Sequence, residues 1–397
     1  MTAAPLPIPF ADTPVPGHGE LGLYLHVPFC LRKCPYCSFF SVAGAREMHG
    51  GYVRAVKGQM ARMLESGRIG DLKVATVFVG GGTPSIVAPD KLTDVLAQFH
   101  ARFIMAAGEV ETSIEVNPAT VGYPELSLLF RGGFNRISIG VQSLVDRELR
   151  ELGRPHTADD ALRTIADARR AGFANLNIDL MYGLPGQTVA GWEKTLARAL
   201  AEGPDHLALY ELTIEEGTPF ARQQQQGGLE LPSEDAVLDM MAATAETIAA
   251  AGFSRYEISN YARPGRECRH NLNYWRNGWY VGLGPGAVSC LAGRRYTAVA
   301  DVVEYCRRIA AGEEWWSDEE ELDLEARFRE TVVMGLRMTG GISLVELRRR
   351  FGLNILEYYG DTLRQLEQQG LVAVQGDRLR LTPAGMNLAN QVMYRLV

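Results

Sequence analysis

The feature that most constrains the fold of this chain is a regular alternation of short β-type runs with helical stretches between residues 23 and 214. Each helical stretch carries apolar residues at three- and four-residue steps. Such alternation predicts an α/β fold with a parallel sheet made of right-handed βαβ units. Six runs suit an open, partial (β/α)6 barrel better than a closed eight-stranded one. The predicted strands are 23–27, 74–82, 112–118, 136–143, 175–183 and 206–214, and the predicted helices include 46–65, 89–106, 158–171 and 189–202.

The pattern changes after residue 222, and we predict four segments. These are a mobile Pro-rich tail (1–20), the partial barrel (21–222), a connecting region (223–324) and a C-terminal winged-helix-like domain (325–397).

The C-terminal domain is predicted from two helices, a hairpin and a last helix. A winged helix can bind DNA, but residues 341–397 hold seven Arg against five Asp or Glu. This small excess favours a docking or lid module over a DNA-binding one. The predicted elements are 344–351, 355–369, 371–382 and 384–395.

Charge and hydropathy exclude several partners. The 397 residues carry a formal net charge of −7, so no basic field would recruit nucleic acid or anionic lipid. No apolar stretch approaches the roughly 20 residues that span a bilayer, and the first twenty residues lack the features of a secretory signal. The sequence therefore predicts a cytoplasmic protein without a transmembrane segment, and peripheral contact with a membrane stays open.

Polar residues stand at or just past the ends of four predicted strands: Gly82 with Thr83, Glu115, Gln142 and Asp179. The carboxyl ends of parallel strands meet at one edge, where the βα loops build ligand sites. Ordinary turn chemistry would explain any one of these positions. Four on the same edge favour a ligand site.

Three cysteines, Cys30, Cys34 and Cys37, follow the first predicted strand with C-x3-C-x2-C spacing. A structural zinc site usually needs four ligands in two separated pairs, and no second pair follows. A [4Fe–4S] cluster fits better, because each thiolate binds one iron and a fourth iron would stay open. Three further cysteines are scattered and are predicted to be packed or surface thiols: Cys268, Cys290 and Cys306.

The motifs "GGGTPS", "EVNP", "GVQS", "LGRPH" and "NIDLMYGLPGQ", together with the cysteine spacing, resemble the radical S-adenosylmethionine superfamily. More narrowly, they resemble the oxygen-independent coproporphyrinogen III oxidase-like family, over about residues 20–390. The resemblance implies that Cys30, Cys34 and Cys37 hold a [4Fe–4S] cluster and that S-adenosylmethionine occupies the open iron. It assigns the surroundings of this cofactor to Tyr24, Tyr36, Gly81, Gly82, Thr83, Glu115, Gln142, Arg154 and Asp179.

Two departures resemble the haem chaperone (HemW) branch of this family. The oxidases carry a further cysteine two positions after the triplet, where this chain has Phe39, and they have a long N-terminal arm before the motif. The segment "HNLNYW" also matches the HNxxYW motif of that branch, which implies haem contact by His270, Tyr274 and Trp275. Imidazole is a strong axial ligand for haem iron. Guanidinium groups pair well with propionates, and the nearby candidates are Arg266, Arg269 and Arg276. The alternative is that His270 and the aromatic residues only pack a domain junction.

Three functions follow from the resemblance. The first is a haem chaperone that carries the cluster and S-adenosylmethionine and hands haem to acceptor proteins. The second is a coproporphyrinogen III oxidase, which Phe39 disfavours, and the third is a radical enzyme acting on another tetrapyrrole. No catalytic residue is assigned, and we predict that oxidase activity is absent.

Overall fold

The computed structural model describes residues 20–65 and 72–397, so the predicted tail at 1–20 lies outside the described residues except for Glu20. Six parallel strands follow one another in sequence order, which confirms the predicted α/β partial barrel. Each lies within a few residues of a predicted run. They are β1 (Glu20–Val27), β4 (Lys73–Gly81), β6 (Glu111–Val116), β7 (Arg136–Gln142), β8 (Asn175–Tyr182) and β9 (His206–Glu211).

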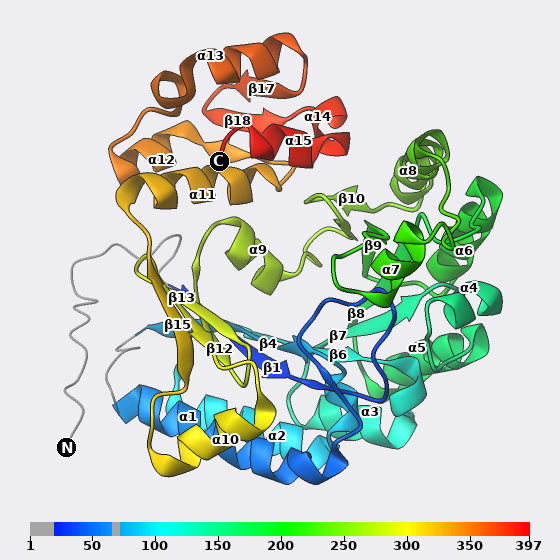
Figure 1. The fold of residues 1–397 in the computed structure, drawn as a ribbon, viewed down its shortest axis with the longest axis vertical. Helices are drawn as coiled ribbons and strands as arrows, with labels where there is room; N and C mark the ends of the chain where they lie inside the picture. The colour runs from blue at the N-terminus through cyan, green and yellow to red at the C-terminus, as the bar shows by residue number, and fades with distance from the viewer. Residues whose placement is uncertain (1–19, 66–71) are drawn as a thin grey trace.

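Helices that connect these strands cover one face of the sheet (Figure 1). The bounds of α5 agree with the sequence prediction, because the residues at both of its ends are typical of helix termini. Thr157 and Asp160 form a capping box at the start, and Gly172 closes the end with φ 114°, which side chains disfavour. The helices of this part are α1 (His49–Glu65), α2 (Pro89–Arg102), α3 (Tyr123–Arg131), α4 (Asp146–Glu151), α5 (Ala158–Ala171) and α6 (Val189–Ala201).

The sheet extends beyond the six predicted strands. The first residues of β1 are paired on both sides, because β12 (Trp279–Leu283) joins it in parallel, with Leu21 beside Trp279. The segment predicted only as a connection therefore belongs to the same sheet. Its other elements are α7 (Pro219–Gln225), α8 (Glu234–Ala250), β10 (Ser254–Arg255), β11 (Asn260–Ala262), α9 (Arg269–Trp275), β13 (Val288–Leu291), β14 (Arg294–Ala298), α10 (Val302–Ala311) and β15 (Trp316–Glu321).

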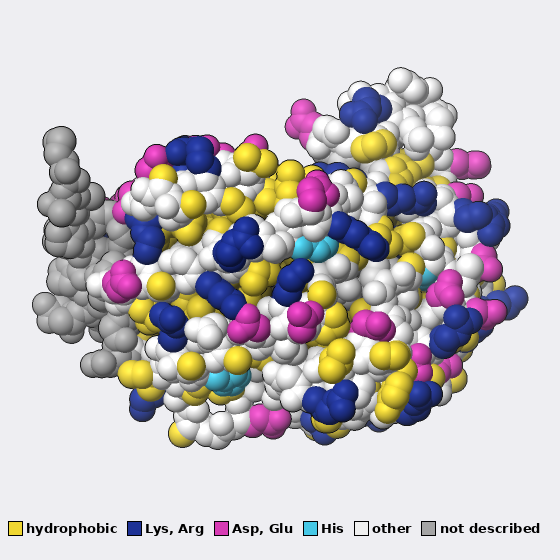
Figure 2. All heavy atoms as spheres, turned by 90° about the horizontal axis from the view of Figure 1, so that it is seen from below, with side chains coloured by type: hydrophobic (Ala, Val, Ile, Leu, Met, Phe, Trp, Pro, Cys, Tyr) yellow, Lys and Arg dark blue, Asp and Glu magenta, His cyan; other side chains and the backbone are white. Residues whose placement is uncertain are grey.

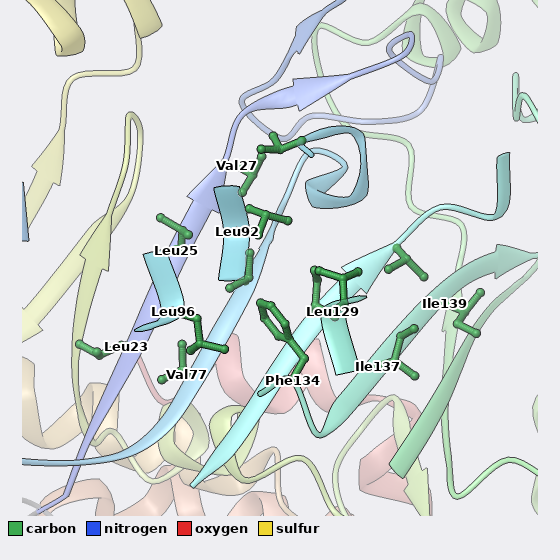
Figure 3. Close-up of a cluster of buried hydrophobic side chains, with 14 of the residues drawn as sticks. Leu23, Leu25, Val27, Val77, Leu92, Leu96, Leu129, Phe134, Ile137 and Ile139 are labelled. Carbon is green, nitrogen blue, oxygen red and sulfur yellow. The ribbon is translucent and has the colours of Figure 1, made fainter. Parts of the chain in front are cut away.

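The main core lies between the sheet and its outer helices. Figure 3 shows Leu23, Leu25 and Val27 of β1 pointing toward Leu92 and Leu96 of α2. These five side chains are almost fully buried. Alternate residues of a strand lie on the same side of the sheet, and residues three or four apart lie on the same side of a helix. The apolar side of β1 and the apolar side of α2 therefore bury each other. This packing holds the strands in register and fixes where their carboxyl ends meet.

The C-terminal module has its own core of buried apolar residues, including Phe328, Leu347 and Leu379. A three-stranded sheet in the order β16, β18, β17 packs with helices, which is the predicted winged-helix-like arrangement. The predicted last helix is split at Leu388, whose φ of −111° lies outside the helical range, and both pieces turn buried residues to the core. The elements are α11 (Leu324–Leu336), β16 (Ile342–Ser343), α12 (Leu344–Phe351), α13 (Ile355–Gln368), β17 (Val372–Gln375), β18 (Arg378–Leu381), α14 (Pro383–Asn387) and α15 (Ala389–Tyr394).

Among the described residues, no helix combines the length and the apolar character that crossing a bilayer requires. On the face seen in Figure 2, basic and acidic side chains are interspersed. The boundaries at residues 222 and 324 remain predictions, since the core of the barrel and that of the connecting region are continuous.

Candidate functional site

The three clustered cysteines lie on a loop directly after β1, here called the cysteine loop (residues 30–37). Its ends are tied to the fold by the short parallel pair β2 (Phe29–Cys30) and β3 (Val42–Ala43). The backbone N–H of Cys37 donates to the carbonyl of Cys34 at 3.2 Å, which turns the loop back on itself. All three thiols are free, partly exposed and line one cavity of 540 Å³ at the carboxyl ends of the strands.

The glycine run after β4 lets this backbone approach the cysteine loop. Gly81 has φ 111°, and a Cβ there would lie 2.5 Å from Nδ1 of His26. A Cβ on Gly82 would lie 2.6 Å from the carbonyl oxygen of Phe29. Only glycine fits such close approaches. The hydroxyl of Thr83, next in the chain, donates to Sγ of Cys30 at 3.6 Å.

Two carboxyl groups face the cavity from neighbouring parts of the sheet. Glu115 Oε2 accepts from the backbone N–H of Gly81 at 3.1 Å. Asp179 accepts from Ser138 Oγ at 3.2 Å and from Asn177 Nδ2 at 2.6 Å. Burial, followed by the charge of Asp179, raises the pKa of Glu115 to about 7. Burial also raises the pKa of Asp179 to about 6, against the hydrogen bonds that it accepts. These acids therefore favour a cationic neighbour, which would restore their ordinary pKa values.

A bulge at the end of β7 places two further predicted residues at the cavity. The pairing of β7 with β8 shifts between Gly140 and Gln142, and Gln142 has φ 67°. Its Oε1 accepts from the hydroxyl of Tyr210 at 2.7 Å. Arg154 donates to the carbonyl of Gly140 at 2.8 Å and approaches Sγ of Cys34 at 3.8 Å. The bulge thus aims an amide and a guanidinium at the space above the cysteine loop.

Eight of the nine residues predicted to surround S-adenosylmethionine line this cavity with the three cysteines. Tyr24 lies deeper, where its hydroxyl contacts Nδ1 of His26 at 3.1 Å. The eight are Tyr36, Gly81, Gly82, Thr83, Glu115, Gln142, Arg154 and Asp179. Their roles toward a cofactor stay predictions.

The donor set fits a cubane cluster better than a single ion. The irons of a cubane are each bound by a separate thiolate, and the thiols of three cysteines line this one cavity. The contacts of Thr83 with Cys30 and of Arg154 with Cys34 are of the kind that tunes cluster potentials.

A second, smaller cavity of 280 Å³ lies inside the barrel, beside the first. Its lining mixes aromatic and polar side chains and includes Ser138, Asn177 and Arg136, which the sequence prediction missed. The missed signal is alternation: Arg136 and Ser138 in "RISIGVQ", and Asn175, Asn177 and Asp179 in "NLNIDLMY", stand two positions apart. Residues two apart in a strand share a face, so these strands carry a polar inner face. The volume is below the roughly 300–1,000 Å³ of pockets for drug-sized ligands.

The first residue of the HNxxYW motif is fixed inside the barrel. Nδ1 of His270 lies 2.8 Å from Thr76 Oγ1, and Nε2 lies 3.0 Å from the hydroxyl of Tyr274. Its ring stacks on Phe78 at 5.2 Å, and burial lowers the pKa of His270 to about 3. Both ring nitrogens are therefore occupied and the ring is neutral. Ligation of an iron by His270 would require one of these two contacts to break.

Helix α9, which carries the motif, is anchored by a buried carboxylate. Glu111 accepts from the backbone N–H groups of Arg269 and His270, at 2.9 and 3.0 Å. A carboxylate at a helix N-terminus pairs with the free N–H groups there. Cys268 is also fully buried and contacts Glu111 at 3.6 Å, so its thiol does not reach the surface.

The predicted haem residues do not share one space. His270 and Tyr274 face the inner cavity, whereas Trp275 lines a third cavity on the other side of α9. Of the three arginines predicted near propionates, Arg269 and Arg276 line that third cavity and Arg266 does not. Helix α9 is thus a partition between two cavities.

Two family models match this chain. One described as Radical SAM superfamily matches residues 24–199, and one described as HemN C-terminal domain matches residues 322–388. A protein named Heme chaperone HemW from Bacillus subtilis is 32% identical over 369 residues, which cover 93% of this chain and 97% of that protein. Another of that name, from Mycobacterium tuberculosis, is 34% identical over 400 residues, 99% and 98% of the two chains.

Among solved structures, coproporphyrinogen III oxidase (HemN) from Escherichia coli is similar with a TM-score of 0.82. The match covers 95% of this chain and 90% of that one, at 24% sequence identity. At this sequence identity the structural similarity establishes the fold only. The activity has to be inferred from the residues that line the cavities.

Proposed function

This chain belongs to the HemW branch of the radical S-adenosylmethionine superfamily, and we propose from that premise that it is a haem chaperone, which binds haem and transfers it to acceptor proteins in the cytoplasm. The observation that carries the proposal is residue 39. Where the resembling oxidases have a further cysteine, this chain has Phe39, 68% exposed at the rim of the cysteine cavity. A phenyl ring supplies neither a proton nor a thiolate, so chemistry that depends on that cysteine is absent here.

The proposal includes a [4Fe–4S] cluster held by Cys30, Cys34 and Cys37, with S-adenosylmethionine at its open iron. When bound, a reduced cluster supplies an electron that cleaves this cofactor. The chain's own contribution is positioning: the carboxylates of Glu115 and Asp179 suit the cationic groups, and the backbone after β4 can approach closely. The other proposed cofactor contacts are Tyr24, Tyr36, Gly81, Gly82, Thr83, Gln142 and Arg154.

The HNxxYW motif, with His270, Tyr274 and Trp275, is proposed as the part that connects the cofactor site to haem. We also keep the division into a barrel (21–222), a connecting region (223–324) and a C-terminal module (325–397) as a proposal. The continuous core supports treating the first two as one folding unit.

The test is a comparison of two ligands with anaerobically reconstituted protein. We expect stoichiometric haem binding with a Soret band that persists through gel filtration, and no loss of carbon dioxide from coproporphyrinogen III under reducing conditions. The variant Phe39→Cys serves as a matched control for the missing thiol. Robust decarboxylation of coproporphyrinogen III by the unmodified chain would contradict the chaperone assignment.

A further inference from the structure

A cleft of 740 Å³ separates helix α9 from the C-terminal module, and we call it the α9 cleft. Its floor is formed by the first residues of β1 and β4, such as Leu21 and Thr76, so it lies at the end of the sheet opposite to the cysteine loop. In Figure 1, α9 stands between the sheet and α11. The cleft is larger than either of the two cavities described above.

Apolar side chains from both sides line the α9 cleft. Trp275 contributes from α9, and Ile342 and Leu347 contribute from the C-terminal module. Val345, which also lines the cleft, is 68% exposed. The guanidinium of Arg337 stacks on the Trp275 ring, 4.3 Å from its centroid. The rest of the Trp275 side chain and the aliphatic side chains suit a flat, apolar ring system, which would be removed from water between them.

The cleft is also basic, although the whole chain carries a net charge of −7. Five arginines line it against three acidic residues, and no carboxylate of the described residues lies within ion-pair distance of these arginines. Asp377, next to Arg378 in the chain, accepts from Ser343 and from the backbone N–H of Val345. Glu346 precedes Arg350 by one helical turn and forms no ion pair with it. Unpaired guanidinium groups indicate an anionic ligand. The arginines are Arg269, Arg276, Arg349, Arg350 and Arg378.

Arg350 shows this lack of compensation most clearly. It donates only to backbone carbonyls, those of Arg276 at 3.4 Å and Asn277 at 3.1 Å, and so bridges the module to the end of α9. Burial, followed by the charge of Arg327, lowers the pKa of Arg350 to about 10. The charge of Glu346, which also lines the cleft, offsets only part of this effect, and a bound carboxylate would offset more of it.

We infer that haem binds in the α9 cleft, with its ring beside Trp275 and against the aliphatic side chains of the C-terminal module, its propionates at Arg276 and Arg349, and the thioether of Met338 on its iron. This inference rests on the proposed haem chaperone function and moves the site away from His270. Among the described residues that line the cleft, Met338 is the only one with a side chain of the His, Cys, Tyr or Met type known as axial ligands. Thioether is a softer and weaker ligand for ferric iron than imidazole, which suits a protein that must release its haem.

His270 then acts as a positioning residue. Its contact with Thr76 holds α9 against β4, and its contact with Tyr274, within α9, fixes the orientation of the imidazole ring. This places Trp275, at the end of the same helix, at the cleft wall. The motif would serve haem binding through the geometry of α9 and not through an iron–imidazole bond.

The carboxylate part of the inference is tested with haem and its dimethyl ester, titrated into the full chain. The probe variant is Arg276→Gln/Arg349→Gln, because neither side chain has a hydrogen bond or ion pair within the described residues. The matched control is Arg348→Gln, whose residue lies on the same helix α12 outside the cleft. We expect a loss of roughly tenfold or more in haem affinity in the double variant and none in the control. The ester should bind the unmodified chain and the double variant equally.

The axial ligand is tested by Met338→Leu, which keeps the volume, with Met334→Leu on α11 as the control outside the cleft lining. We expect the unmodified chain to show the weak near-infrared band of a thioether–iron(III) bond and to prefer ferrous to ferric haem. Both properties should vanish in Met338→Leu and persist in Met334→Leu and in His270→Gln.

The outcomes separate the two proposals. If the unmodified chain binds haem and both the arginine and methionine variants bind it unchanged, the cleft is not the site, while the chaperone function stands. If His270→Gln alone removes axial ligation, the inner face of α9 carries the iron and the inference is wrong. If the unmodified chain binds no haem, the chaperone proposal fails and the inference fails with it.

Discussion

Replacement of Glu115 by glutamine should stabilise the ligand-free protein, and the gain should depend on pH. Burial raises the pKa of Glu115 from 4.5 to about 7 in the folded chain. The folded protein therefore holds this proton more tightly than the unfolded chain does. The contribution of Glu115 to stability is fully present below pH 4.5 and is lost as pH rises toward 7. Glutamine mimics the protonated acid and avoids that loss.

The size of the effect follows from the same pKa values. The ionised carboxylate costs the folded state about 1 kcal/mol at pH 5 and about 3 kcal/mol at pH 8. Glu115→Gln should therefore raise the free energy of unfolding by about these amounts. Asp179, which interacts with Glu115, would also ionise more easily in the variant and add to the gain at high pH.

The assay is equilibrium urea unfolding at pH 5 and pH 8, followed by circular dichroism, without S-adenosylmethionine. Asp160→Asn is a control with the opposite sign, because the backbone N–H of Thr157 holds the pKa of Asp160 below its ordinary value. That variant should lose stability, and more so at pH 8 than near the acid limit. Equal stabilisation by Glu115→Gln at both pH values, or destabilisation at pH 8, would refute the role of charge burial. If the expected results are obtained, the Glu115 carboxylate destabilises the ligand-free protein and becomes favourable when a cationic cofactor binds beside it.

Three further results are expected. Replacement of Cys30, Cys34 or Cys37 by alanine should abolish the electron spin resonance signal of the reduced cluster, whereas Cys290→Ala should leave this signal intact. Full zinc occupancy in anaerobically purified protein would contradict the presence of the cluster. Asp179→Asn should weaken the effect of S-adenosylmethionine on the spectrum of the reduced cluster by about tenfold in concentration, and an unchanged titration would mean that this carboxylate is structural. His270→Ala should lower the free energy of unfolding by roughly 2–4 kcal/mol, measured by urea unfolding, because Thr76 and Tyr274 lose buried partners; a fully stable variant would argue against the positioning role.

Much of the barrel was predictable because its signals are local. Each parallel strand has a short apolar run, and a helix such as α5 carries its own start and stop residues. The cysteine loop and the polar strand ends were also predictable, since parallel strands bring their carboxyl ends to one edge. Local patterns of this kind do not depend on what packs against them.

The parts that the sequence did not reveal depend on distant pairing. Strand β15 has the sequence "WSDEEE" and exposes nearly all of its side chains. It is a strand because its backbone pairs with β14, and Arg294 and Arg295 of β14 face its acids, at 2.8 Å for Arg294 with Glu321 and 3.3 Å for Arg295 with Glu320. Aspartate and glutamate have a low propensity for β-strands, so this sequence does not predict a strand. The α9 cleft was missed for the same reason, because its walls come from segments about 70 residues apart in the chain, such as Trp275 and Val345.

The pairing of β1 with β12 has a consequence for the order of events during synthesis. β1 precedes the other described strands in the chain, yet one of its edges stays open until the segment around Trp279 has been made. An open edge of a buried, apolar strand is a template for pairing with other chains. The cysteine loop follows the carboxyl end of β1, so the nascent chain exposes its thiols together with this open edge. Growth conditions that slow translation between β4 and β12 should therefore favour aggregation over cluster insertion.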